Sequence, residues 1–144
     1  MRKIFAVAVV ALLLAIFAAH PAMAADKTPE QLVKEAKAAI KEVSIDDVKK
    51  MIDAKETVIL LDVTDKQEFE AGHLPGAMNI SRGTLEFKSA MMLLDKKARI
   101  VVYCGLDLRS PLATRTLNEL GYANAVNMIG GMKAWKAAGY PIAP

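Results

Sequence analysis

The sequence predicts an α/β fold in which helices cover both faces of a mostly parallel β-sheet. Two short apolar runs, residues 57–63 and 99–103, are nearly continuous and are typical of strands that are covered on both faces. Segments with helical spacing of apolar residues alternate with these runs along the chain. No internal repeat or low-complexity tract interrupts the alternation after the N-terminal apolar segment, so one layered domain is expected.

The first 24 residues have the pattern of a secretory signal peptide. Arg2 and Lys3 precede an unbroken apolar run over residues 4–19, and a small-residue cleavage site follows at residues 22–24. The run holds 16 residues, whereas a membrane-spanning helix needs about 20. We therefore expect residues 1–24 to be removed and the protein to be exported, to a periplasm, with no membrane attachment afterwards.

The remaining 120 residues fit one domain of common size. Residues 25–43 are expected to form an N-terminal helical extension, and residues 44–144 the main domain. Loss of the two leader cations lowers the net charge from +3 to +1, and no basic run with interleaved aromatic residues predicts nucleic-acid binding. With one cysteine and one histidine left, no metal site or cofactor is expected.

The extension is expected to be a helix that begins after Thr28. Thr28 is a good N-cap, Pro29 suits the first helical position, and Gln31 completes a capping box. Apolar residues such as Leu32 and Ala36 then recur on one side at helical spacing. We expect this apolar stripe to pack on the domain itself, and docking onto a partner protein is the alternative.

The single cysteine, Cys104, lies where the second apolar run gives way to a helical segment at residues 110–120. The loop can point several backbone N–H groups inward, the helix N-terminus adds partial positive charge, and Arg109 adds a permanent cation. Such surroundings favour the thiolate, the nucleophilic form. Cys104 is the candidate nucleophile, and a small buried residue at a strand end is the structural alternative. The candidate substrate-binding residues are Gly105, Leu106, Asp107, Leu108, Arg109 and Ser110.

Three segments, in order, resemble the signatures of rhodanese-like sulfurtransferases. They are residues 60–80, which contain Leu60-Leu61-Asp62-Val63 and Gly72-His73-Leu74-Pro75-Gly76-Ala77, the loop from Cys104 to Ser110, and residues 130–141, which begin with Gly130-Gly131-Met132. Together they span nearly everything after Ser44. The resemblance implies a single-domain, exported protein with the rhodanese-like three-layer sandwich, no cofactor and sulfurtransferase activity.

The resemblance also implies a chemical cycle and structural roles. Cys104 would take sulfane sulfur from a small anionic donor, thiosulfate or a persulfide, and hold it as a persulfide. It would then pass the sulfur to cyanide, a thiol or an acceptor protein. The matching residues Asp62 and His73 are expected to be structural, whereas Thr64 stands where the family usually shows an arginine.

Two other functions stay open. Cysteine phosphatases use a C-x5-R loop, whereas four residues separate Cys104 from Arg109, and the shorter loop fits sulfur better than a phosphoryl group. A non-catalytic rhodanese-like module that binds a partner or senses redox state is the main alternative. An odd cysteine in an exported chain favours a reactive thiol.

The loop departs from the family pattern at Asp107, which adds a negative charge between two leucines. A carboxylate facing the pocket would repel thiosulfate and disfavour the thiolate, whereas one facing solvent would only line the rim. We expect weak thiosulfate:cyanide activity and a protein or small-molecule persulfide as the natural donor.

Four consecutive apolar residues, Met91 to Leu94, stand outside this pattern. Thioethers can bind Cu(I), but methionine among aliphatic residues usually fills core gaps. We expect this cluster to lie in the core.

Overall fold

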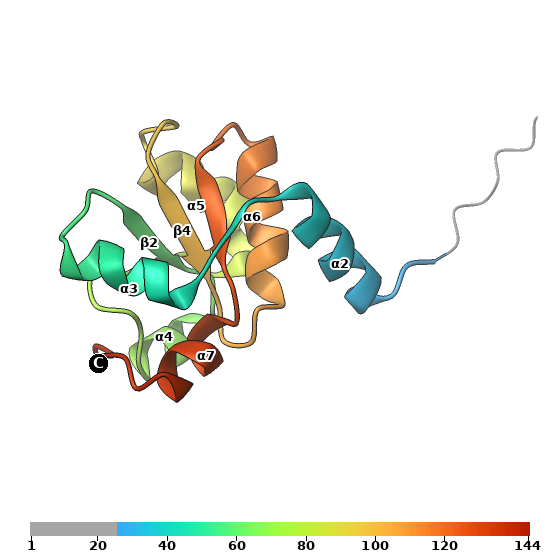
Figure 1. Ribbon diagram of the computed structural model, residues 1–144. Coiled ribbons are helices and arrows are strands. Elements are labelled where there is room, and N and C mark those ends of the chain that lie inside the picture. The colour runs from blue at the N-terminus through green and yellow to red at the C-terminus, as the bar shows by residue number, and fades with distance from the viewer. Residues whose placement is uncertain (1–25) are drawn as a thin grey trace, which may run out of the picture.

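The computed structural model describes residues 26–144, so the predicted signal peptide lies outside the described residues. The described part forms one sheet of five strands in the order β1-β5-β4-β2-β3, with every pair parallel and helices on both faces (Figure 1). This confirms the predicted α/β class. The elements are α2 (Pro29–Ala39), β1 (Glu42–Val43), α3 (Ile45–Asp53), β2 (Ile59–Asp62), α4 (Lys66–Glu70), β3 (Met78–Asn79), a 3-10 turn (Arg82–Thr84), α5 (Leu85–Met92), β4 (Ile100–Tyr103), α6 (Arg109–Glu119), β5 (Ala125–Met128) and α7 (Gly131–Ala137).

The central strand β4 divides its side chains between two apolar cores. Ile100 and Val102 lie in the core that includes residues of α5 and α6, whereas Val101 and Tyr103 lie in the core with α3 and α7. Successive residues of a strand point to opposite faces, and Cys104 continues the alternation into the first core. The strand therefore delivers the cysteine side chain to the α6 side of the sheet, at its carboxyl edge.

The N-terminal extension is attached to the domain in two ways. Its helix α2 begins with the predicted capping box at Thr28 and packs against α6, with Ala36 fully buried (Figure 1). The short strand β1, which the sequence analysis did not predict, then pairs in parallel with β5. Two residues are too few to give a periodic pattern. The expectation that the apolar stripe packs on the domain is confirmed for Ala36, whereas Leu32 remains 40% exposed.

The expectation that residues 91–94 fill the core is wrong for three of the four. Leu93 is 1% exposed, but Leu94 is 83% exposed and both methionines are exposed as well. The physical reason is that α5 ends at Met92, and Leu93 alone turns inward, where its carbonyl accepts a hydrogen bond from the Tyr122 hydroxyl at 2.9 Å. None of the helices in residues 26–144 is long and apolar enough to span a membrane.

The adjacent leucines give a matched test of this packing. We expect Leu93→Ala to lower the free energy of unfolding by about 2–5 kcal/mol, because it leaves a cavity in the α5/α6 core. Leu94→Ala should change it by less than about 0.5 kcal/mol, since the side chain is exposed. Urea unfolding measures both, and equal losses would contradict the assignment of the core.

Candidate active site

The loop between β4 and α6 is fixed by the start of α7. The backbone N–H groups of Met132 and Lys133 donate to the carbonyl oxygens of Cys104 and Gly105, at 2.8 and 3.0 Å. Gly131 makes this close approach possible, because its φ is +57° and an added Cβ would lie 2.4 Å from the Cys104 carbonyl oxygen. The first two carbonyl groups of the loop are thereby held by α7.

The Cys104 side chain is buried, with 1% of the residue exposed, and its sulfur accepts two hydrogen bonds. Both come from Ser110, whose backbone N–H and hydroxyl lie 3.4 and 3.3 Å from Sγ. The expected ring of loop amides around the sulfur is therefore reduced to a single residue of the first turn of α6. Within residues 26–144, the backbone N–H groups of residues 105–109 donate to no protein acceptor.

Arg109 places its guanidinium across Gly105 and binds Glu68 of α4. Two hydrogen bonds of 2.7 Å join the groups, and a Cβ added at Gly105 would lie 3.7 Å from the Arg109 fork. The pair raises the pKa of Arg109, and the hydrogen bond from Arg109 lowers the pKa of Glu68. Sequence reasoning missed Glu68 as a site residue, because it lies 41 residues before Arg109 and no local pattern joins the two.

Asp107 occupies neither of the positions that the sequence left open. It is 8% exposed, and its carboxylate is bound by Lys37 Nζ of α2 at 2.5 Å and by Asn127 Nδ2 of β5 at 2.8 Å. Burial opposes the charge on Lys37, but the hydrogen bond and charge of Asp107, together with Glu42, raise the Lys37 pKa overall. The carboxylate of Asp107 is therefore paired rather than free beside the sulfur.

Two hollows lie beside the loop, and Gly105 and Leu108 each line one of them. Leu108 faces a groove of about 280 Å³ that it shares with Leu112 of α6 and the apolar residues Leu32 and Val33 of α2. Leu106 is exposed and lines neither hollow. The second hollow, about 250 Å³, is lined by Gly105 of the loop and by Asp62, Thr64, Glu68, Ala71, Gly72, Met132 and Lys136.

The structural roles expected for Asp62 and His73 are supported by their contacts. Asp62 accepts hydrogen bonds from the backbone N–H and the hydroxyl of Thr64, at 2.8 and 2.6 Å, and holds the end of β2. Thr64 thus takes part in the turn where the family usually has an arginine. His73 stacks on Phe69 and its Nδ1 lies 3.0 Å from the Phe69 carbonyl oxygen, so it fixes the turn after α4.

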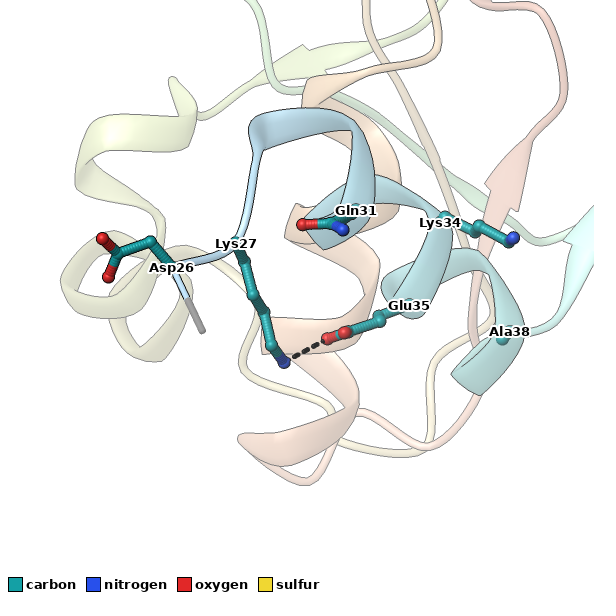
Figure 2. A pocket seen from close by; sticks show the side chains of 6 residues that line it. All are labelled: Asp26, Lys27, Gln31, Lys34, Glu35 and Ala38. Carbon is teal, nitrogen blue, oxygen red and sulfur yellow. Dashed lines mark hydrogen bonds and ion pairs between the residues drawn. The ribbon is translucent and has the colours of Figure 1, made fainter. Parts of the chain in front are cut away.

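A further hollow of about 480 Å³ lies along α2 and is lined by Asp26, Lys27, Gln31, Lys34, Glu35 and Ala38 (Figure 2). The ion pair between Lys27 and Glu35, at 2.7 Å, lies among these side chains. No residue of the Cys104 loop lines this hollow. It is therefore not part of the site around the thiol, although it is larger than the two hollows beside the loop. Within residues 26–144, no group of three or more histidine, cysteine, aspartate or glutamate side chains is arranged to hold a metal ion.

Gly131 and Gly139 both have a positive φ, but only Gly131 lies close to the Cys104 loop. Alanine at each position therefore distinguishes the cost of backbone strain from the cost of crowding the loop. Alanine at Gly139, where φ is +71° and no atom lies within 4 Å of an added Cβ, should cost about 1–2 kcal/mol of unfolding free energy. Gly131→Ala should cost about 1–3 kcal/mol more, because the methyl group meets the Cys104 carbonyl oxygen. We expect only Gly131→Ala to change the iodoacetamide alkylation rate of Cys104, and equal rates for the two variants would contradict this packing.

Curated relatives of the chain include proteins named for sulfur transfer. The putative sulfur carrier protein YrkF of Bacillus subtilis is 31% identical over 67% of this chain, which spans only 51% of that protein. The putative sulfurtransferase YtwF of the same organism is 36% identical over 71% of this chain and 96% of its own. The thiosulfate sulfurtransferase GlpE of Pseudoalteromonas translucida is 32% identical, with coverages of 69% and 92%.

Solved structures with the same fold carry two kinds of name. The polysulfide-sulfur transferase homodimer of Wolinella succinogenes is 34% identical, with a TM-score of 0.66 and coverages of 77% of this chain and 83% of its own. A protein of unknown function from Rhodopseudomonas palustris, described as a possible tyrosine phosphatase, is 26% identical, with a TM-score of 0.76 and coverages of 86% and 100%. The sequence profile of the rhodanese-like domain matches residues 44–138, and the chain therefore belongs to the rhodanese-like family.

Proposed function

We propose that this protein is a sulfurtransferase that carries sulfane sulfur as a persulfide on Cys104. The observation that carries the proposal is that one loop holds both the Cys104 sulfur and a run of backbone N–H groups without protein acceptors in the described residues. The sulfur of Cys104 is held by Ser110, and the five N–H groups of residues 105–109 have no protein acceptor in the described part of the chain. Relatives of the chain that are named sulfurtransferases support the same activity.

The proposed cycle has two transfers. The Cys104 thiolate attacks the outer sulfur of thiosulfate, the S–S bond of the donor breaks, and sulfite leaves with the electron pair. A thiolate or cyanide then attacks the terminal sulfur of the Cys104 persulfide, and the Cys104 thiolate leaves as that S–S bond breaks. Covalent catalysis divides one difficult transfer into two easier ones, and no oxidant or reductant is consumed.

The loop suits the persulfide better than it suits the free thiol. A second sulfur bonded to Sγ places the negative charge about 2 Å beyond Sγ. The unused N–H groups of residues 105–109 can then bind that charge, as preorganised donors do for developing anions. Arg109 stabilises the persulfide anion less than its full positive charge would, because two of its guanidinium N–H groups are already bound to Glu68.

The sulfur donor belongs to the class of small anions that carry sulfane sulfur. Because Lys37 and Asn127 bind the Asp107 carboxylate, charge repulsion no longer argues against thiosulfate. A polysulfide or a persulfide has the same reactive sulfane sulfur, and the name of the Wolinella succinogenes protein supports including polysulfide. Cyanide, a small thiol or a thiol of another protein can accept the sulfur. Residues 1–24 would direct the enzyme out of the cytoplasm, to a periplasm.

Phosphatase activity is the second chemistry to test, since one structural relative is described as a possible tyrosine phosphatase. Only four residues separate Cys104 from Arg109, and the guanidinium that would hold a phosphoryl group is bound to Glu68. Both facts favour sulfur transfer. A non-catalytic binding module would need neither the pairing of Ser110 with Sγ nor the free amides.

The Ser110 hydroxyl should control the reactivity of the thiol. Hydrogen bonds to charged groups contribute about 1.5–3 kcal/mol, so Ser110→Ala should lower the iodoacetamide alkylation rate at neutral pH about tenfold or more. Ser89→Ala is the matched control, because Ser89 is also buried but donates to the Glu86 carbonyl oxygen. Similar rates for the two variants would show that the hydroxyl does not stabilise the thiolate.

The persulfide itself is directly measurable by intact-protein mass spectrometry. After treatment with thiosulfate or polysulfide, we expect an adduct of about 32 Da, one sulfur atom, that cyanide removes and that Cys104→Ser lacks. Turnover of p-nitrophenyl phosphate should be absent. Absence of the adduct with every donor would support the binding module, and Cys104-dependent phosphatase turnover would replace the proposal.

A further inference from the structure

Asp107 has an unusual backbone in the middle of the loop. Its φ is +60°, in the left-handed region, which costs a residue with a Cβ about 1–2 kcal/mol. The residue is also 8% exposed although it carries a charge. Such a conformation persists only where the surroundings hold it in place, so its contacts explain the shape of the loop.

Those contacts come from two distant parts of the chain. Lys37 Nζ of α2 lies 2.5 Å from Asp107 Oδ2, and Asn127 Nδ2 of β5 donates to Asp107 Oδ1 at 2.8 Å. Asn127 also donates to Glu42 Oε1 at 2.8 Å, and Lys37 lies 3.7 Å from the same oxygen. The Lys37 ammonium group therefore lies near two carboxylates, those of Asp107 and Glu42, and both accept a hydrogen bond from the Asn127 amide. Without Lys37, this cluster would hold two negative charges and no cation.

We propose that Lys37 is a positioning residue of the active-site loop, and that its ammonium group keeps the Asp107 carboxylate turned away from Cys104. This inference rests on the proposed function, because it assigns the N-terminal extension a role at the reacting thiol. The extension supplies a cation to the middle of the loop, between the cysteine and the arginine.

The consequence of losing Lys37 follows from electrostatics. A buried carboxylate that loses its cation is strongly disfavoured, and Glu42 would repel Asp107 across Asn127. Movement of the Asp107 side chain out of this cluster would relieve the repulsion. The freed negative charge would then lie in the loop that must bind an anionic donor. It would lower the rate at which anionic reagents react with Cys104 more than the rate for neutral reagents.

The experiment compares two alkylating reagents of similar size and different charge. Cys104 is treated with anionic iodoacetate and with neutral iodoacetamide, and the ratio of the two rates is compared among wild type, Lys37→Met, Asp107→Asn and the double variant. We expect Lys37→Met to lower the ratio about tenfold, as a charge within several ångströms would. The double variant should restore the wild-type ratio and Asp107→Asn should not lower it, since asparagine tolerates the same backbone and removes the negative charge.

Two further variants control for the helix. Lys34→Met removes an exposed lysine from the same helix and should leave the ratio unchanged (Figure 2). Lys37→Arg keeps the cation and should stay close to wild type. If Lys37→Met does not fold, recovery of the fold by adding Asp107→Asn supports the proposal, and failure to recover it overturns the proposal.

A ratio for Lys37→Met equal to that of Lys34→Met overturns the inference. So does a double variant whose ratio is as low as that of Lys37→Met, because Lys37 would then act through packing alone. Alkylation reads the thiol and its electrostatic surroundings without any sulfur transfer. Absence of a persulfide would therefore refute the proposed function while leaving this positioning role measurable.

Discussion

The two hydrogen bonds from α7 to the carbonyl groups of Cys104 and Gly105 are the constraint on which the site depends. They fix the direction in which the chain leaves β4, and a glycine at position 131 is needed for the approach. In the described part of the chain, the N–H groups of residues 105–109 have no protein acceptor. The last helix of the domain thus determines the chemistry available in the loop before α6.

Charged side chains around the loop form pairs on both sides. Arg109 is bound by Glu68 from α4, and Asp107 is bound by Lys37 from α2. Each pair neutralises most of the charge that its loop residue would otherwise direct at the sulfur. The groups that donate hydrogen bonds to the sulfur are the backbone N–H and the hydroxyl of Ser110, which do not depend on the conformation of long side chains.

Local patterns predicted the strand before Cys104, the helix after it and the capping box at Thr28, because each depends on neighbouring residues. The partners Glu68, Lys37 and Asn127 could not be predicted in this way, since they lie 41, 70 and 20 residues from the loop residues that they bind. The inward turn of Leu93 and the exposure of Leu94 depend on where α5 ends. Composition alone could not separate two adjacent leucines.

Burial of the sulfur has a consequence for the oligomeric state of a protein with a single cysteine. Two copies can be cross-linked through a disulfide only if their sulfur atoms come within about 2 Å of each other. Cys104 is 1% exposed, so atoms of its own chain cover the sulfur in each copy. Small sulfur compounds need far less space than a second polypeptide. The fold therefore shields the single thiol from covalent dimerisation without a second cysteine.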